Sequence, residues 1–411
     1  MHVSTATIVF RLAIFLLVLI AIDFYVFRSI KSGFSYIQSD RAKQAINWVY
    51  WGVNISFILG LIYGIATLNR FKGPQLVLYT FLGVMFALLY IPKLVVIFFL
   101  LIEDIFRLLR ASGVIIGKAA SDNFADIPYF EGRRKFLSQI ALAVASIPFI
   151  SVLYGVTKGK YNYKVHRVSL KFKDLPDAFN GLTITQISDI HSGSFDDETE
   201  VKRGIDLINE QKSDLLFFTG DLVNNLSDEM ERWTPLFKQL NAPMGMFSIL
   251  GNHDYGDYLS WVSDEAKQKN LERLKAIHKE LGFKLMLNEN TIIEKSGQQF
   301  SLIGVENWGS GSFAKYGDLE KALSGVTNDS FKILLSHDPS HWEAQTLNNS
   351  KHIHLTLSGH THGMQFGIEI PGIKWSPVQY RYPQWAGLYE EKNKYLYVNR
   401  GFGFIGFPGR V

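Results

Sequence analysis

Long apolar runs dominate the first third of the chain, where polar side chains are sparse. Each of four runs reaches the ~20 mostly apolar residues that a helix needs to cross a bilayer. The first two runs are apolar on all sides and lack the polar stripe of a helix that packs on a soluble core. The pattern predicts an α-helical membrane region over residues 1–160 with about four transmembrane helices, Thr7–Val26, Ile46–Leu68, Gln75–Ile102 and Phe136–Val156.

The third run is interrupted by Pro92 and Lys93, so residues 75–112 can be read in two ways. We favour one long span whose amphipathic extension leaves the membrane. The alternative is a separate interfacial helix over Leu94–Leu109, which carries several charged side chains. The choice matters because a second helix could change the number of spans from even to odd. The C-terminal domain would then lie on the other side of the membrane.

Basic residues favour one orientation of these spans. Lysine and arginine are frequent in the first and third connections and rare in the second, and such residues mark cytoplasmic loops. The C-terminal domain is then expected to be extracytoplasmic, in a multi-pass protein of the cell membrane. Residues 132–137, with Arg133 and Arg134, also resemble a twin-arginine export signal. The alternative, ordinary flanking charges, predicts the same orientation.

From about Tyr161 the hydrophobic period changes to short, often β-branched runs separated by helical patterns. This alternation predicts an α/β domain with mixed sheets over residues 161–411. The expected strands are Leu182–Ile187, Leu215–Thr219, Gly245–Leu250, Gln299–Val305, Phe331–Leu335, His354–Leu357 and Lys394–Val398. The expected helices are Glu200–Gln211, Asp228–Leu240 and Trp261–Leu281.

Composition excludes several classes of partner and of functional site. The chain has 411 residues and a formal net charge of +4, too small to indicate a nucleic-acid partner. It has no cysteine, which excludes disulfides, a catalytic thiol and cysteine-ligated metals. The absence of cysteine does not fix the compartment, since such a chain is stable in reducing and oxidising surroundings.

Five short polar motifs each follow a strand-like apolar run in the C-terminal half. They supply carboxylates, an amide and imidazoles, which are ligands for divalent metals. Ligands in open α/β sheets bind beyond the carboxyl ends of the strands. The motifs are Asp189-Ile190-His191, Gly220-Asp221, Gly251-Asn252-His253-Asp254, Ser336-His337-Asp338 and Gly359-His360-Thr361-His362.

Spacing within the motifs suggests roles. Residues i and i+2 of an extended chain point to one side, so Asp189 lies beside His191, and His360 beside His362. Asp221 ends a buried strand and must be paired, hydrogen-bonded or metal-bound. Each pair alone is weak evidence, because surface turns and satisfied core histidines are common.

The tetrapeptide from Gly251 to Asp254 is the most diagnostic motif. Asn252 offers an amide oxygen to a metal, and His253 can donate a proton to a departing alkoxide. We expect Asp254 to hold the His253 ring and keep it protonated. A β-turn containing Asn-His is the ordinary alternative, but it leaves the preceding apolar strand unexplained.

Together the motifs resemble the calcineurin-like metallophosphoesterase family, in the same order and without substitution from about Leu182 to Gly363. The resemblance implies two mixed β-sheets packed as a sandwich and flanked by helices. It also implies a metal on Asp189, His191 and His362, a second on Asn252, His337 and His360, and Asp221 bridging both. His253 would act on the leaving group, with Asp254 supporting it.

The resemblance further implies hydrolysis of phosphoester or pyrophosphate bonds by a hydroxide that bridges two divalent ions of Mn, Fe or Zn. The membrane anchor is similar to that of bacterial UDP-2,3-diacylglucosamine hydrolase-type enzymes, which makes a lipid-linked substrate at the membrane surface one expectation. Members of the family usually continue with another strand, so truncation at Val411 stays open.

Two further features carry alternatives. Asp23 and Lys93 are ionisable residues within spans, so a transporter or receptor with a non-catalytic metal-binding domain is the alternative function. Residues 399–410 are rich in glycine and aromatic residues. That tail either contacts substrate phosphate through Arg400 or Arg410 or packs its phenylalanine rings on the sheet.

Overall fold

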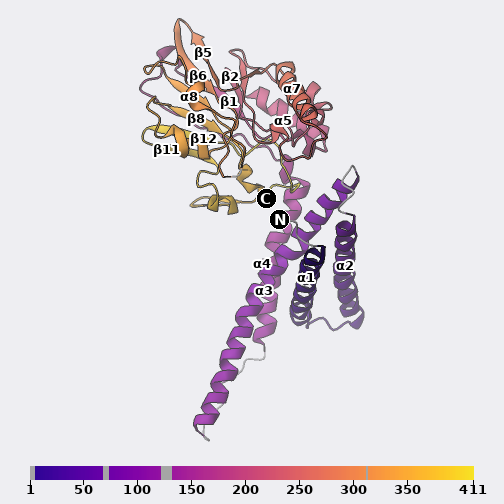
Figure 1. Ribbon diagram of the computed structural model, residues 1–411. Coiled ribbons are helices and arrows are strands. Elements are labelled where there is room, and N and C mark those ends of the chain that lie inside the picture. The colour runs from indigo at the N-terminus through magenta and orange to yellow at the C-terminus, as the bar shows by residue number, and fades with distance from the viewer. Residues whose placement is uncertain (1–4, 68–73, 122–131, 312) are drawn as a thin grey trace. The chain divides into compact units, whose positions relative to one another are not determined.

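The structure is a computed structural model, and it describes residues 5–67, 74–121, 132–311 and 313–411. The chain forms two compact units, Met1–Thr157 and Lys158–Val411. The first unit is helical, and the second contains all of the described strands (Figure 1).

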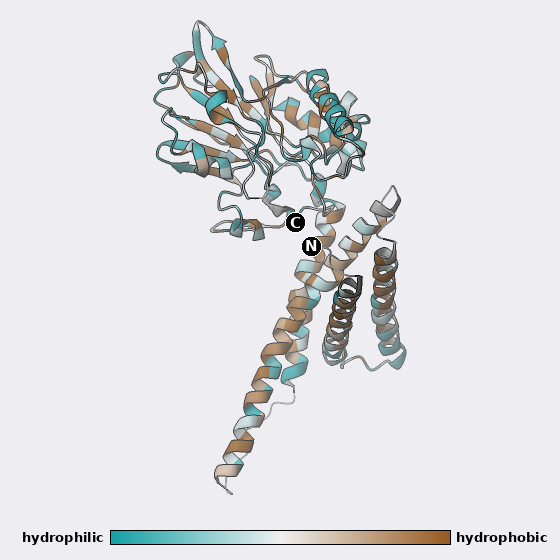
Figure 2. Cartoon of the chain, viewed as in Figure 1, coloured by the Kyte–Doolittle hydropathy of each residue, from teal (hydrophilic) through white to brown (hydrophobic). Residues whose placement is uncertain are grey.

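The N-terminal unit consists of four long helices, α1 (Thr5–Gly33), α2 (Asp40–Ala66), α3 (Pro74–Ala120) and α4 (Arg133–Thr157). All four are long and apolar enough to cross a membrane, and most of their residues are hydrophobic (Figure 2). Helix α3 continues through Pro92, so the prediction of one long helix is confirmed and no separate helix begins at Leu94.

A buried ion pair joins three of these helices. Lys93 Nζ lies 2.6 Å from Asp23 Oδ1, and both side chains are almost fully buried. The ammonium also donates to Asn54 Oδ1, and the Tyr90 hydroxyl donates to Asp23 Oδ2 over 3.2 Å. Because an isolated charge in hydrocarbon is costly, each charge here stabilises the other in place.

The C-terminal unit contains two larger sheets. The four-stranded sheet is parallel throughout, in the order β1 (Ile184–Ile187), β2 (Leu215–Phe218), β3 (Met246–Ser248) and β4 (Lys284–Leu285). The six-stranded sheet is mixed, because its outermost pair at each edge is antiparallel. Its order is β11 (Gly387–Glu391), β12 (Lys394–Val398), β8 (Leu355–Ser358), β7 (Lys332–Leu335), β6 (Gln298–Gly304) and β5 (Glu289–Lys295).

Alternation along the strands builds the core between these sheets. Leu215 and Phe217 of β2 pack in one cluster with Phe300 of β6 and Leu335 of β7. The intervening residues Leu216 and Phe218 belong to a second cluster on the other face of the sheet, formed with helical side chains. Both faces of β2 are therefore buried, as its uninterrupted apolar sequence requires.

Helices cover the outer faces. α5 (Glu198–Glu210) and α7 (Asp264–Glu280) pack on the four-stranded sheet, and α8 (Leu319–Ala322) packs on the six-stranded sheet. The predicted helix Asp228–Leu240 is wrong as one element. It is divided into a 3₁₀ turn, Ser227–Met230, and the short helix α6 (Thr234–Phe237), because Pro235 cannot continue a helix and favours its first turn.

The predicted strands are all present, with ends shifted by a few residues. Single 3₁₀ or π turns occupy many loops. They are Gly159–Tyr161, Asp177–Phe179, Ser192–Ser194, His253–Tyr255, Trp342–Thr346, His362–Gln365 and Pro377–Tyr380. A separate hairpin, β9 (Ile368–Ile370) with β10 (Ile373–Trp375), lies outside both larger sheets.

The buried ion pair leads to a stability prediction. Lys93→Met leaves the Asp23 carboxylate buried without its partner, which is expected to destabilise the helical unit by about 3–5 kcal/mol. Replacing both partners, as Asp23→Leu with Lys93→Met, should restore part of that loss. Thermal denaturation of the full chain in detergent measures both effects.

The matched control is Lys43→Met, whose partner Asp40 is exposed, so its loss should change stability little. Equal midpoints for Lys93→Met and Lys43→Met would contradict a stabilising role for the buried pair.

Candidate metal centre

The parallel strands bring the predicted motifs together. β1, β2 and β3 of one sheet and β7 and β8 of the other all end where a polar motif begins. Near these ends, Gln186 Nε2 donates to the Ser358 carbonyl over 2.9 Å, and Asn399 Nδ2 donates to the Gln186 carbonyl over 3.0 Å. These bonds tie the two sheets to each other beside the motifs.

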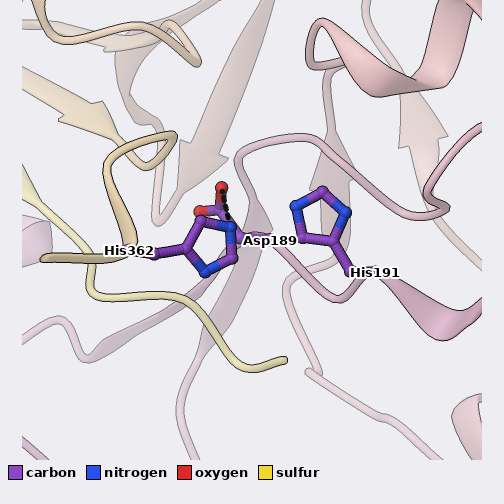
Figure 3. Close-up of side chains that lie close together, drawn as sticks. All are labelled: Asp189, His191 and His362. Atoms are coloured by element: carbon purple, nitrogen blue, oxygen red, sulfur yellow. Dashed lines mark ion pairs between the residues drawn. The ribbon is translucent and has the colours of Figure 1, made fainter. Parts of the chain in front are cut away.

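The first group of side chains is Asp189, His191 and His362, all of them buried (Figure 3). Their ligand atoms lie within 4.8 Å of one another. Asp189 Oδ1 is 3.3 Å from His362 Nε2. Neither ring nitrogen of His191 or His362 has a hydrogen-bond partner, which is costly for a buried polar atom. A bound cation would satisfy one nitrogen of each ring.

The second group is Asp221, His337 and His360, whose ligand atoms also lie within 4.8 Å of one another. His337 Nδ1 donates to the Thr219 carbonyl over 2.7 Å, so its Nε2 faces Asp221 Oδ2, 3.2 Å away. His360 Nδ1 lies 2.8 Å from Asn252 Oδ1. The Asn252 amide oxygen therefore faces this second group.

Asp221 belongs to the second group and also lies against His191 of the first. Its Oδ2 atom lies 3.5 Å from His191 Nε2 and 3.2 Å from His337 Nε2. A single buried carboxylate oxygen thus touches one histidine of each group. This is the position from which a carboxylate can bridge two cations.

The electrostatics fit cation binding. Burial raises the pKa of Asp189 to about 6 and lowers the pKa of His191 to about 3. Neutral imidazole is the form that ligates metals, and a nearby cation would stabilise the carboxylates. Burial lowers the pKa of His337, but the charges of Asp221 and Asp189 and the hydrogen bonds with Asp221 and Thr219 together outweigh it and raise the pKa to about 10. The space between Asp221 and His337 therefore favours positive charge.

The loops reach this geometry through left-handed backbone. Five of the predicted ligands have positive φ, with values from 47° to 72°. They are Asp189, His191, Asp221, His360 and His362. The expectation that extended backbone sets the i, i+2 pairs Asp189–His191 and His360–His362 is therefore wrong. Non-glycine residues in this region cost of order 1–3 kcal/mol each, a strain typical of functional sites.

Glycines allow the loops to approach one another. A side-chain carbon at Gly251 would collide with Asp221, and one at Gly359 would collide with Ser188 and Asp189. The glycines of these two motifs are thus required by the packing of loops that are far apart in the sequence.

His253 lies beside the first group. Its ring centroid is 4.9 Å from that of His191, and its Nδ1 donates to the Asn224 carbonyl over 2.8 Å. Its Nε2 is therefore the nitrogen left for a substrate. The His253 amide donates to Asp221 Oδ1 over 2.8 Å, which links this loop to the shared carboxylate.

The structure does not place Asp254 on the His253 ring, contrary to our expectation. Asp254 Oδ2 accepts from the amides of Asp221 (2.9 Å) and Gly251 (2.8 Å). Its Oδ1 accepts from the amides of Leu222 (2.8 Å) and Val223 (3.3 Å). Asp254 thus joins two loops. Backbone amides bind both of its carboxylate oxygens, and the Asn224 carbonyl accepts from the His253 ring instead.

Sequence reasoning missed the residues that orient the ligands. The Tyr382 hydroxyl lies 2.8 Å from His360 Nε2, and the Tyr258 hydroxyl accepts from Asn252 Nδ2 over 2.8 Å. Such partners fix the orientation of metal-binding side chains. No local pattern marks these tyrosines or Asn224, because they act across loops.

The glycine-rich tail packs against the site. Phe402 and Phe404 are buried in the core beneath α5. Arg410 donates to the Gly401 and Gly403 carbonyls over 2.9 and 2.7 Å, and Arg400 donates to Glu369 over 2.6 Å. These contacts favour the packing interpretation of the tail.

The position of Asp254 leads to a prediction. Asp254→Asn replaces one acceptor oxygen with an amide donor that faces backbone N–H groups. We expect the variant to lose about 1–3 kcal/mol of stability and to bind metal more weakly. Chemical denaturation and metal analysis of the full chain test this, with exposed Asp228→Asn as the control.

If Asp254→Asn instead kept its stability and metal content but lost the hydrolytic activity that the resemblance implies, Asp254 would act through the His253 ring, as the sequence motif suggested.

Comparison with known proteins agrees with this geometry. Residues 7–160 match the family model "Probable Calcineurin-like phosphoesterase, transmembrane domain". Residues 182–364 match the model "Calcineurin-like phosphoesterase".

Relatives share one or both parts. "Uncharacterized metallophosphoesterase YkuE" of Bacillus subtilis is 31% identical, over 59% of this chain and 79% of the relative. "Transmembrane protein with metallophosphoesterase domain" of Danio rerio is 26% identical over 90% of this chain and 80% of the relative. "Phosphodiesterase YaeI" of Escherichia coli is 27% identical over 66% and 93%. The chain belongs to the calcineurin-like metallophosphoesterase family and carries a transmembrane domain ahead of the catalytic one.

Proposed function

We propose that the chain hydrolyses phosphodiester or pyrophosphate bonds with two divalent cations held by the loops at the carboxyl ends of the strands. The observation that carries this proposal is the position of Asp221, whose Oδ2 atom lies 3.5 Å from His191 Nε2 and 3.2 Å from His337 Nε2. One shared carboxylate between two buried histidine groups is the arrangement that a binuclear site needs.

The donor set fits such a pair. Asp189, His191 and His362 would hold one cation, and Asn252, His337 and His360 the other, with Asp221 shared. Two cations so held would lower the pKa of a water molecule between them and neutralise charge on the phosphoryl oxygens. Mixed oxygen and nitrogen donors suit manganese, iron or zinc.

His253 is the proton donor in this proposal. Because the Asn224 carbonyl accepts from Nδ1, the ring presents Nε2 to the substrate. In its imidazolium form the ring donates the Nε2 proton to the departing oxygen. Asp254 contributes by keeping the Asp221 and Gly251 loops joined, so that the shared carboxylate and His253 keep their spacing.

A lipid-linked substrate at the membrane surface is the finer part of the proposal. It is supported by the four helices long and apolar enough to span a bilayer. The alternative of a transporter or receptor has less support. Asp23 and Lys93 pair with each other, and Asn54 and Tyr90 complete the pair. Among the described helices, this pair therefore serves packing.

The catalytic proposal is tested with the full chain in detergent, Mn²⁺ and bis(4-nitrophenyl) phosphate. Asp221→Ala should abolish hydrolysis and reduce the amount of bound metal, because both groups of ligands lose the carboxylate that they share. On a diester with an alkyl leaving group, whose departing oxygen must be protonated, His253→Ala should lower kcat by about 10²–10⁴ without changing the amount of bound metal.

Activity of Asp221→Ala equal to that of the parent would reject the site. Full activity of His253→Ala would assign the leaving-group proton to another donor.

The extracytoplasmic location of the catalytic domain is a separate proposal, supported by the distribution of basic residues. A chain without cysteine permits single-cysteine labelling. In intact bacterial cells, a membrane-impermeant maleimide should modify Val262→Cys, whose side chain is 95% exposed. Tyr36→Cys, in the first connection and 58% exposed, should react only after permeabilisation. The reverse pattern would place the domain in the cytoplasm.

A further inference from the structure

The hairpin of β9 and β10 has one wholly apolar face. Its register pairs Ile370 with Ile373, Glu369 with Lys374, and Ile368 with Trp375. Successive side chains of a strand point to opposite faces, and paired residues share a face. The three isoleucines and Trp375 therefore lie on one face, and the charged pair lies on the other.

This apolar face is exposed. Ile370 and Ile373 are 56% and 53% exposed, and Ile368 and Trp375 are 48% and 38% exposed. Tyr380, which lies beside Trp375, is 81% exposed. A contiguous apolar surface rimmed by polar groups marks an interaction site, whereas scattered exposed apolar residues would need no explanation.

One end of the hairpin is fixed beside the metal centre, and the other end is fixed to Val411. Ser376 Oγ, directly after β10, donates over 2.8 Å to the carbonyl of Gly363, the residue after His362. Beyond it, the Tyr382 hydroxyl contacts His360 Nε2. Before β9, the Gly367 amide donates over 3.1 Å to the carbonyl of Val411, the last residue (Figure 1). The hairpin is thus part of the segment that carries His360 and His362.

The short linker between the last span and the C-terminal unit indicates which partner the hairpin can reach. The last candidate span ends at Thr157, and Tyr161 already belongs to the core of the C-terminal unit. Four residues reach at most about 14 Å when fully extended. The C-terminal unit is therefore tethered close to the bilayer. The bilayer is an apolar phase that is always near this unit.

We infer that the apolar face of this hairpin inserts into the lipid interface. Trp375 and Tyr380 match the aromatic residues that prefer the headgroup level of a membrane. Lys374 on the opposite face donates to the Ala386 carbonyl and so faces the protein, while the neighbouring exposed Arg381 can stay among lipid phosphates as the isoleucines enter the acyl region. The insertion sets the metal centre beside phosphate groups at the membrane surface, and it holds whatever the substrate proves to be.

The test uses single cysteines in the otherwise cysteine-free chain. Ile370→Cys is labelled with bimane in the full chain, in vesicles of phosphatidylethanolamine and phosphatidylglycerol with and without lipids brominated on the acyl chains. The control is Ile292→Cys on β5, because Ile292 is 47% exposed in the same unit. Each labelled variant must keep the unfolding midpoint of the parent chain.

We expect brominated lipid to quench bimane at position 370, and aqueous iodide to leave it unquenched. Position 292 should show the opposite behaviour. Quenching of position 370 by iodide alone would overturn the inference. Protection of position 370 from both quenchers would overturn it as well, since a second copy or another part of this chain would then cover the face.

A charge substitution gives an independent readout. With bimane at Ile368→Cys, the added pair Ile370→Glu and Ile373→Glu should reduce quenching by brominated lipid to the level of position 292. Unchanged quenching would show that the label reports a nearby membrane without insertion of this face.

Discussion

The contact of Asp221 with two histidines of different groups is the interaction on which the rest of the site depends. Its Oδ2 atom contacts His191 and His337, while its Oδ1 atom accepts the amide of His253. One carboxylate therefore sets the spacing of both candidate metal positions and of the proton donor. It is held by Asp254, which accepts its amide together with those of three neighbours, and by Gly251, where any side chain would collide with it.

Burial has opposite consequences in the two units of the chain. In the helical unit, Lys93 and Asp23 neutralise each other, and a tyrosine and an asparagine complete their hydrogen bonds. At the ends of the strands, the carboxylates of Asp189 and Asp221 are buried among histidines, and the ring nitrogens of His191 and His362 have no hydrogen-bond partner. The first arrangement is complete in itself. The second is satisfied by divalent cations, because they supply positive charge and accept nitrogen lone pairs.

The sheets fix the loops, and the loops store strain. Parallel strands of both sheets end at the same edge, so short loops bring their side chains together without long insertions. The ligands then adopt left-handed backbone, which the surrounding core must hold in place. The same segment that carries His360 and His362 continues into the apolar hairpin, so a surface for lipid and the metal centre share one piece of backbone.

The sequence by itself determined the two-part organisation, the strands and the residues that gather at their ends. These follow from the period of apolar residues and from the rule that parallel strands present their carboxyl ends at one edge. Tertiary structure decided the rest. Asp254 binds backbone amides, Asn224 orients His253, and Tyr382 contacts His360. Pro235 divides a helix that periodicity alone predicted as continuous. Such details depend on loop dihedral angles and on partners such as Thr219 for His337, which are 118 residues apart, and local patterns carry no signal for contacts at that separation.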